Sequence, residues 1–405
     1  MSVKVDFDLN RLDAGFFADP YPTYRALRSR DPVHRMADGS YFLTSYADLA
    51  AIYRDAGTWS SDKRKAFEPK YGHSLLYEHH TTSLVFNDPP YHTRVRRLLG
   101  PSFNPKALKA LQPRIEALVE RLLDRAAERR RIDLIDDFAA AIPVQLIGDM
   151  LGVPQNERGP LRGWSLAILG ALEPVLSAQQ LEAGTRSVIE FKSYLRGLVE
   201  RRMKDGARDE AEILSHLIAA SELLSGTGER LSELELLHNC IFILNAGHET
   251  TTNLIGNAVD LLLRNREALE DLRANPALLP SAVEEFLRME SSNQLGNRMA
   301  ARDASVGGIA MPAGTYVHLC IGAANRDPAQ FSEPDRLDLR RDPNRHLAFG
   351  AGIHTCAGAA LARMEAQVAI GALLKKFTRI EAAGSPVRSG RARFRGFMHF
   401  PVKLN

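Results

Sequence analysis

Residues 349–358 read Phe349-Gly350-Ala351-Gly352-Ile353-His354-Thr355-Cys356-Ala357-Gly358. The glycines permit backbone conformations and close approaches that side chains would block, so amide N–H groups can turn toward the Cys356 sulfur. Such hydrogen bonds tune a thiolate that is bound to a metal. A lone cysteine is more often a buried structural thiol, but the complete ten-residue pattern favours a metal ligand. After Gly358 the sequence predicts an alanine-rich helix, whose small face lets a flat cofactor lie against it.

The two other cysteines, Cys240 and Cys320, lie far from Cys356 and from each other in the sequence. No Cys-x-x-Cys spacing occurs, which argues against a disulfide framework and against a zinc site. We therefore expect any cysteine chemistry to use a single thiolate.

Composition bounds the possible classes of protein. Apolar residues make up 45% and charged residues 25% of the 405 positions, so the chain can bury a large core. No linker-like stretch or internal repeat divides it, which predicts one domain over residues 1–405. The net charge of +3, without a basic motif, sets nucleic-acid binding aside. Residues 1–35 carry no apolar run long enough for a signal peptide or membrane span, so we expect a cytoplasmic protein without membrane contact.

Helical periodicity dominates the chain, which predicts a mainly α protein with small β-sheets. Apolar residues recur at helical spacing in the segments 104–128, 137–151, 188–204, 210–223, 265–273 and 279–290. The longest predicted helix begins at Ser232, where Glu235 completes a capping box, and runs to about Arg264, a length of roughly 50 Å. Strands are expected at 33–44, at 305–310 and 315–320 joined by the turn Pro312-Ala313-Gly314, and from Arg393 to Leu404.

The middle of this long helix reads Ala246-Gly247-His248-Glu249-Thr250-Thr251. Glycine costs about 1 kcal/mol relative to alanine inside a helix, so Gly247 needs a packing or a functional reason. Without the cysteine motif, these residues favour threonine hydroxyls that bond back to the preceding turn and a solvated Glu249.

Two further patterns place charged side chains on one face of a helix. His92 and Arg96 are four residues apart and can reach the same anion. Glu285 and Arg288 are three residues apart, a common pair that is worth about 0.2–0.5 kcal/mol. Neither pattern specifies a function by itself.

Together these features resemble the cytochrome P450 family, whose signature Phe-Gly-x-Gly-x-His-x-Cys-x-Gly matches residues 349–358 at every fixed position. The similarity extends from Ala18-Asp19-Pro20-Tyr21-Pro22 to Phe400-Pro401-Val402, and the chain looks most like the soluble bacterial members. The resemblance implies a triangular helical body in which haem lies between a long central helix and the helix after the cysteine loop.

The resemblance implies haem b (iron protoporphyrin IX) as the cofactor and Cys356 as the ligand of the iron. The residues at family positions that contact haem are His92, Arg96, Arg298 and His354 for the propionates and, for the ring and the loop, Ala246, Gly247, Phe349, Gly350 and Gly358.

The resemblance also gives roles to two motifs. In the family the long helix is locally widened above the iron to make a pocket for dioxygen, and an acid followed by a threonine relays protons. Here these catalytic residues are Glu249 and Thr250. The family's Glu-x-x-Arg motif matches Glu285 and Arg288, with Arg326 as the expected third member. We assign this trio to structure, because buried bidentate pairing would hold the cysteine loop in register.

A cysteine thiolate donates electron density to haem iron and favours cleavage of the O–O bond. The resemblance therefore implies a monooxygenase that uses O2 and two electrons to hydroxylate or otherwise oxidise a small organic substrate. The sequence shows no flavin or iron–sulfur domain, so we expect the electrons from a ferredoxin and its NAD(P)H-dependent reductase. Two alternatives are a peroxygenase driven by hydrogen peroxide, against which the Glu249 and Thr250 pair speaks, and a non-catalytic haem sensor.

The substrate site is the part least determined by motif. By family analogy we expect substrate contacts from Asn245, Gln294, Leu295 and Phe397. Asn245 stands where the family more often has an apolar residue, and its amide bonds either a substrate oxygen or another side chain. The basic residues of segment 63–70 could favour a carboxylated substrate, although a solvated loop is the commoner outcome. Candidate positions for ferredoxin docking are Arg97, Lys106, Lys109 and Arg345.

Overall fold

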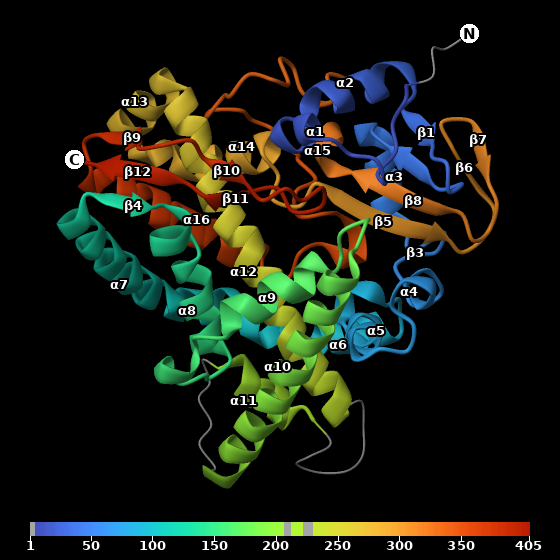
Figure 1. Ribbon diagram of the computed structural model, residues 1–405, viewed down its shortest axis with the longest axis horizontal. Coiled ribbons are helices and arrows are strands. Elements are labelled where there is room, and N and C mark those ends of the chain that lie inside the picture. Colours follow the sequence, from blue (N-terminus) through green and yellow to red (C-terminus); the bar gives the residue numbers. More distant parts are fainter. Residues whose placement is uncertain (1–4, 206–211, 222–229) are drawn as a thin grey trace.

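The computed structural model describes residues 5–205, 212–221 and 230–405. Helices form most of the body, and the small sheets lie in the upper half of the view in Figure 1. The prediction of a mainly α protein with small β-sheets is confirmed. The α-helices are α1 Ala14–Ala18, α2 Tyr21–Arg30, α3 Tyr46–Arg54, α4 Arg64–Tyr71, α5 Leu75–Thr82, α6 Tyr91–Leu99, α7 Pro105–Arg129, α8 Ala141–Met150, α9 Leu161–Gly170, α10 Ala178–Asp205, α11 Ile213–Ala219, α12 Glu233–Arg264, α13 Arg266–Ala274, α14 Leu279–Met289, α15 Ile321–Ala324 and α16 Ala359–Lys376.

Several predicted helices keep their place but change their bounds. The segment 137–151 begins as a π-helical turn, Ile135–Ala139, before α8 follows. The segment 188–204 lies within α10, which begins earlier, at Ala178. Of the segment 210–223, α11 covers Ile213–Ala219, while positions 210–211 and 222–223 lie outside the described residues.

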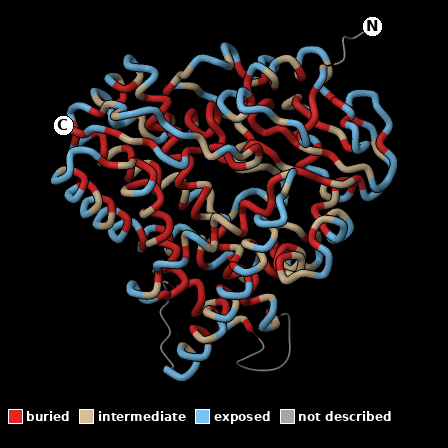
Figure 2. The backbone as a smooth tube through the Cα atoms, in the orientation of Figure 1, coloured by how far each residue is buried: buried red, intermediate tan, exposed pale blue. Residues whose placement is uncertain are grey.

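Helix α12 crosses the centre of the molecule (Figure 1), and its predicted start and end are confirmed. The hydroxyl of Ser232 accepts a hydrogen bond from Glu235 N at 3.2 Å, and the Glu235 carboxylate accepts one from Ser232 N at 2.9 Å. This capping box satisfies backbone donors that the first turn leaves unpaired. Residues along α12 are mostly buried, in keeping with the red interior of Figure 2. Neither α12 nor any other described helix is both long and apolar enough to cross a membrane.

Within the described residues the strands form four small sheets. The largest has the order β1-β2-β8-β5-β3, and the others are β4-β12-β9, β10-β11 and β6-β7. The strands are β1 Val33–Arg35, β2 Tyr41–Leu43, β3 Trp59–Ser60, β4 Arg131–Asp133, β5 Leu295–Ala300, β6 Ala304–Val306, β7 Ile309–Met311, β8 Tyr316–Cys320, β9 Ile380–Ala382, β10 Val387–Arg388, β11 Phe397–His399 and β12 Pro401–Leu404.

One predicted hairpin is wrong. Segments 305–310 and 315–320 were expected to pair, but β8 pairs with β5 and β2 instead. The chain turns earlier, because Gly307 and Gly308 adopt positive φ values of 56° and 79° between β6 and β7. Glycine tolerates this left-handed region without the clash of a Cβ atom. Strand β8 therefore does not pair with β6 or β7 and joins the larger sheet instead.

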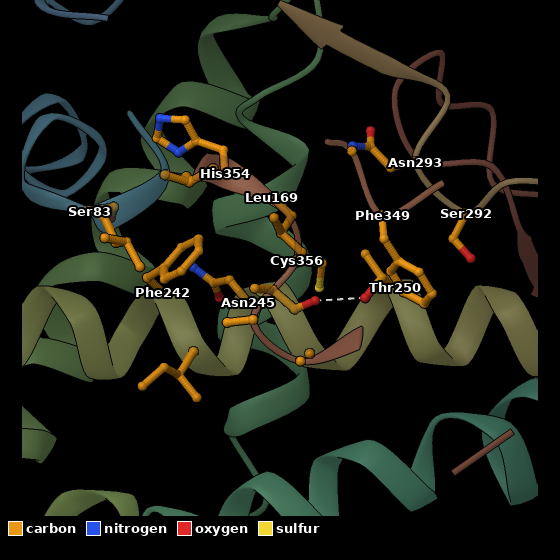
Figure 3. A pocket seen from close by; sticks show the side chains of 18 of the residues that line it. Ser83, Leu169, Phe242, Asn245, Thr250, Ser292, Asn293, Phe349, His354 and Cys356 are labelled. Carbon is orange, nitrogen blue, oxygen red and sulfur yellow. Dashed lines mark hydrogen bonds between the residues drawn. The ribbon is translucent and has the colours of Figure 1, made fainter. Parts of the chain in front are cut away.

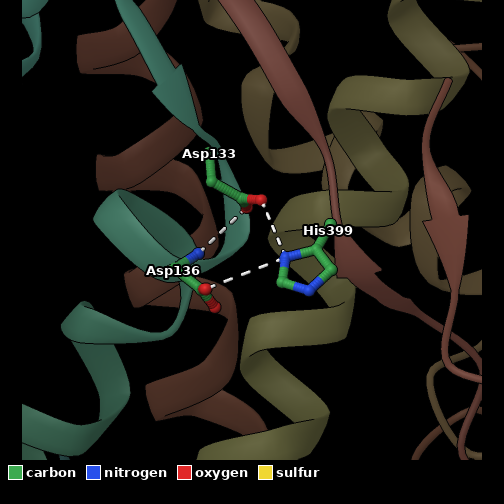
Figure 4. A group of neighbouring side chains, drawn as sticks. All are labelled: Asp133, Asp136 and His399. Atoms are coloured by element: carbon green, nitrogen blue, oxygen red, sulfur yellow. Dashed lines mark hydrogen bonds and ion pairs between the residues drawn. The ribbon is translucent and has the colours of Figure 1, made fainter. Parts of the chain in front are cut away.

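A cluster of Asp133, Asp136 and His399 joins the C-terminal strands to β4 and the π-helical turn (Figure 4). His399 Nδ1 lies 3.1 Å from Asp133 Oδ2 and 3.9 Å from Asp136 Oδ2. Their ligand atoms lie within 4.8 Å of one another, a spacing that a metal ion could bridge. The acids already have partners, since Asp133 accepts the Ile135 N–H and Asp136 pairs with Arg162. The contacts therefore connect segments of the fold.

A buried ion pair on α14 supports the segment that leads to the cysteine loop. Glu285 and Arg288 are fully buried and bidentate, with N–O distances of 2.7 and 2.8 Å. Arg288 also donates to Asn325 O at 2.9 Å, and Asn325 Oδ1 accepts the Leu347 N–H at 2.7 Å. Through Asn325 the pair is therefore connected to the backbone that leads to residues 349–358.

The expected third member of this cluster is wrong. Arg341, rather than Arg326, contacts Glu285, with its Nε 3.2 Å from both carboxylate oxygens. Arg326 donates instead to Met289 O at 2.7 Å and lies over the Tyr21 ring. Its guanidinium is held there by Glu290 and Asp335, so it cannot reach Glu285.

We expect Arg288→Met to lower the free energy of unfolding by about 3–5 kcal/mol, because the Glu285 charge would remain buried without its main partner. The matched control is Arg336→Met. Arg336 forms an ion pair of the same i,i+3 spacing with Glu333, but both side chains are 67% exposed, so a change of about 0–1 kcal/mol is expected. Urea unfolding followed by circular dichroism measures both. Equal losses of unfolding free energy in the two variants would contradict the expectation that the buried ion pair matters more than the exposed one.

Candidate functional site

A cavity of about 330 Å³ lies between α12 and the cysteine loop. Its wall draws on α5, α6, α8, α9 and α12, on β5, and on the loop before β11. Figure 3 shows Asn245 and Thr250 on α12, with Cys356 on the facing loop directed toward that part of the helix. The cavity therefore places the two sequence motifs opposite each other.

The cysteine loop is shaped by its glycines. Gly350 and Gly352 have φ values of 65° and 71°. A Cβ atom at Gly352 would lie only 2.2 Å from Tyr53 O, so no larger residue fits there. The Cys356 N–H donates to Phe349 O at 2.9 Å and closes the loop. The Cys356 side chain then lies on the wall of the cavity.

The three cysteines differ in access. Cys240 and Cys320 are fully buried outside this wall, and burial raises the pKa of each thiol to about 12. Enclosure by protein also raises the pKa of Cys356, while the Gly358 N–H and the nearby Arg96 and Arg363 favour its thiolate. A free thiol at Cys356 is thus reachable from inside the cavity, as a ligand must be.

Basic side chains line one edge of the cavity. His92, Arg96, Arg298 and His354 all lie on its wall. The rings of His92 and His354 are 4.1 Å apart between centroids, and neither nitrogen of His92 nor Nε2 of His354 has a hydrogen-bond partner within the described chain. Burial, with Arg298 and His92 alongside, lowers the pKa of His354 to about 2. This edge is suited to an anion, which would pair with the unpartnered nitrogens.

Lys63 adds a further buried amine near this edge. The sequence favoured a solvated loop here, but Lys63 is only 1% exposed. Its Nζ lies 3.5 Å from Asn297 O and 5.5 Å from the centre of the Tyr316 ring. The expectation of solvation is wrong for Lys63, because this residue precedes α4 and turns inward against β5 and β8. Burial and the neighbouring Arg298 hold its pKa well below the usual value.

Gly247 has a packing reason on α12. A Cβ atom there would lie 2.5 Å from Ile147 Cδ1, so the glycine lets α12 lie close to α8. The adjacent Ala246 is exposed to the cavity. The Thr250 hydroxyl donates to Ala246 O at 2.6 Å, which is the back-bonding that the residues favoured. The helix is α-helical throughout, so the local widening implied by the resemblance is absent.

Glu249 is buried rather than solvated, at 5% exposure. Both of its carboxylate oxygens lie 2.6 Å from Nη1 of Arg391, which also donates through Nη2 to Leu166 O on α9. Burial raises the pKa of Glu249 to about 7, against the opposing effect of Arg391. The acid does not lie on the cavity wall but next to Thr250, which does. Arg391 had no signal in the sequence.

The expected substrate residues divide into two groups. Asn245 and Leu295 line the cavity, and Asn245 Oδ1 has no partner in the described chain. Gln294 and Phe397 do not line it. Gln294 donates to Ser291 O at 2.7 Å, and Phe397 packs on Phe400 with 5.0 Å between ring centres. Among the wall residues that were not named individually from the sequence are His79, His80, Arg393 and Phe394.

All ten residues expected to contact the cofactor lie on the wall of this one cavity. They come from distant parts of the sequence, between His92 and Gly358: His92, Arg96, Ala246, Gly247, Arg298, Phe349, Gly350, His354, Cys356 and Gly358.

Comparison with known proteins identifies the family. The family model for cytochrome P450 matches residues 170–392. Vitamin D(3) 25-hydroxylase of Pseudonocardia autotrophica is 39% identical, over 88% of this chain and 86% of its own. The 6-deoxyerythronolide B hydroxylase of Saccharopolyspora erythraea is 34% identical, over 96% and 97%. The crystal structure of P450BioI in complex with an acyl carrier protein carrying hexadec-9Z-enoic acid has a TM-score of 0.89 and 33% identity, over 97% and 100%.

The cofactor of this family is haem, and the site fits it. Cys356 offers a thiol to the cavity, and the basic edge at His92 and His354 leaves buried nitrogens unpaired. Ala246 and Gly247 present little side-chain volume on the opposite wall. Small residues, an unpaired basic edge and a free thiol are what a flat, anionic, iron-containing group requires. The chain therefore belongs to the cytochrome P450 family, whose members are haem-dependent monooxygenases.

Proposed function

We propose that this monooxygenase oxidises a mainly apolar organic molecule in the cavity, using O2 and two electrons from a ferredoxin and its NAD(P)H-dependent reductase in the cytoplasm. The observation that carries the proposal is the position of Cys356 across the cavity from Thr250, with Glu249 next to it in the chain. A merely haem-binding protein would need the thiol but no buried acid and alcohol beside the cavity.

Haem bound through Cys356 supplies the activation of dioxygen. His92, Arg96, Arg298 and His354 would hold its carboxylates. Hydrogen bonds to these carboxylates would satisfy imidazole nitrogens of His92 and His354 that have no partner among the described residues. The glycines of the loop would leave amide N–H groups free to face the sulfur.

Thr250 and Glu249 are suited to hold and move protons. The Thr250 hydroxyl donates to Ala246 O, and turning away from that carbonyl would direct it into the cavity. Glu249 has a pKa of about 7, so both of its protonation states are accessible near neutral pH. A general acid works best when its pKa lies near the operating pH. Arg391 holds the carboxylate in one orientation.

The relatives support an apolar substrate of considerable size. Two of them are named for the hydroxylation of vitamin D(3) and of 6-deoxyerythronolide B. In this chain the cavity wall is mainly apolar, and many of its residues away from the basic edge are leucine, isoleucine or phenylalanine. For the electron donor, Lys106 and Lys109 are exposed at the start of α7 and offer charge to an acidic ferredoxin.

Cys356 is expected to be the only cysteine needed for haem ligation, because it alone lies on the cavity wall. Cys356→Ala should abolish the thiolate signature of the reduced carbon monoxide complex. The double variant Cys240→Ala, Cys320→Ala should retain it. Absorption spectra of the reduced complexes test both, and survival of the signature in Cys356→Ala would contradict the assignment.

Thr250→Ala should uncouple electron use from product formation. The variant should still bind substrate and consume NAD(P)H with a surrogate ferredoxin and reductase, while hydrogen peroxide replaces most of the product. The matched control is Thr252→Ala, because the Thr252 hydroxyl bonds back to His248 O and lies away from the cavity. Product formed per NAD(P)H is the measurement. Equal coupling in Thr250→Ala and the wild type would return this hydroxyl to a structural role.

Glu249→Gln should slow turnover by roughly 10²–10⁴-fold, the usual contribution of a positioned proton donor. Glu182→Gln removes an exposed acid whose ion pair among the described residues is with Arg186, and it serves as the control. Steady-state rates with saturating ferredoxin measure the effect. A rate within a few-fold of the control would exclude Glu249 from proton delivery.

A further inference from the structure

A series of hydrogen-bonded side chains on α10, α5 and α12 leads from a partly exposed lysine to the wall of the cavity. Lys192 Nζ on α10 lies 2.6 Å from Oε1 of Glu78 on α5, and the same oxygen lies 2.9 Å from Nε2 of His238 on α12. His238 Nδ1 lies 3.3 Å from Nδ1 of His79, back on α5. Lys192 and Glu78 are partly exposed, whereas His238 and His79 are 0% and 2% exposed. The series ends at the cavity, whose wall includes His79.

The order of donors and acceptors in this series is fixed from its outer end. Lysine only donates, and an ionised carboxylate only accepts. Glu78 is ionised, because the bonds from Lys192 and His238 outweigh the effect of burial and lower its pKa. His238 must therefore carry its proton on Nε2, which leaves Nδ1 as an acceptor. His79 must in turn donate from Nδ1, so its Nε2 keeps a lone pair.

Both imidazoles are neutral, as this order requires. Burial lowers the pKa of His238 to about 4 and holds that of His79 well below its usual value. A protonated ring in the middle would carry a donor on each nitrogen and reverse the order. His80 lies next to His79 on the cavity wall, with 5.2 Å between ring centres, but no described side chain fixes its tautomer.

The unpaired acceptor therefore points to a ligand group. No described residue donates a hydrogen bond to His79 Nε2, and this atom is open to the cavity, whose wall also includes the apolar Leu84 and Phe242. A ligand that fills this part of the cavity displaces water from Nε2, so it must supply a donor or leave the acceptor unpaired at a cost in free energy. We propose that His79 Nε2 accepts a hydrogen bond from a hydroxyl group of the substrate, and that Glu78, His238 and Lys192 are positioning residues that fix its tautomer. The inference rests on the proposed function and gives its substrate a chemical class, the alcohols.

Ligands anchored on the haem iron can test this without knowledge of the natural substrate. The probes are 1-(ω-hydroxyalkyl)imidazoles with chains of eight to twelve carbons and their methyl ethers, which can accept but not donate a hydrogen bond. Dissociation constants come from the shift of the haem absorption band when the imidazole binds. At the chain length that reaches His79, the alcohol should bind about 3–10-fold more tightly than its ether, the value of one hydrogen bond.

His79→Phe should remove this preference, because the alcohol ligand should bind more weakly while the ether is little affected. His80→Phe is the matched control, since it changes the neighbouring ring outside the hydrogen-bonded series, and it should keep the preference. An alcohol preference that survives in His79→Phe, or that is lost in His80→Phe, would overturn the proposal. So would the absence of a preference at every chain length in the wild-type protein.

Glu78→Gln tests the positioning residues separately and remains informative if His79→Phe fails to fold. A glutamine amide can donate to His238 Nε2, which allows both imidazoles to invert and His79 to donate from Nε2. The ether should then gain affinity about 3-fold or more while the alcohol stays within about 2-fold. General loosening of the cavity roof, the helices α5, α9 and α10, would weaken both ligands, and that outcome would refute the fixed tautomer. Glu182→Gln should leave both affinities unchanged.

Failure of the proposed function would look different. If no imidazole shifts the haem band in the wild-type protein, the haem site itself is wrong. If every imidazole shifts the band but alcohol and ether bind equally, haem binding stands and only the role of His79 falls.

Discussion

The site depends on a loop conformation that exposes the Cys356 thiol to the cavity, whereas Cys240 and Cys320 are completely buried. Two constraints hold the loop from opposite sides. On one side Gly352 lies so close to Tyr53 O that any side chain would collide. On the other, the buried pair of Glu285 and Arg288 anchors Asn325, which in turn binds the backbone just before the loop. Backbone geometry and a buried ion pair therefore act together on the position of this loop.

The distribution of paired and unpaired polar groups supports the position of the cofactor pocket. Two buried acids, Glu249 and Glu285, are paired with Arg391 and Arg288. The edge with His92 and His354 differs from these two acids, because its imidazole nitrogens are buried without partners among the described residues and Arg298 lies nearby. Unpaired buried polar groups are costly, and a protein retains them where a ligand completes the set. The contrast supports an anionic group at this edge independently of the cysteine.

How much the sequence could predict depended on whether the signal was local. The start of α12 was predictable because a capping box involves residues only three apart. The cysteine loop and its glycines were predictable for the same reason. Arg341 and Arg391 were not, because they meet Glu285 and Glu249 across 56 and 142 residues, and an isolated arginine carries no periodic signal. The hairpin failed because either of two glycine-containing turns could follow 305–306, and only sheet packing decides between them. Burial of Lys63 likewise depends on neighbours from β5 and β8.

Helix α12 is connected by buried polar contacts to α5, α9 and α10, the helices that we call the roof of the cavity. One connection is an ion pair and the other is a series of hydrogen bonds. Arg391 joins Glu249 on α12 to Leu166 O on α9, so any displacement of α9 must break or redirect a bond to the guanidinium that orients the acid. His238, farther toward the start of α12, joins this helix to α5 and α10 through Glu78 and Lys192. Apolar packing tolerates sliding, whereas a buried ion pair and an ordered series of donors and acceptors are directional and tolerate it less. Directional bonds therefore fix the position of α5, α9 and α10 relative to Glu249, the acid beside Thr250. A change in the position of α9 would change the orientation of the Glu249 carboxylate.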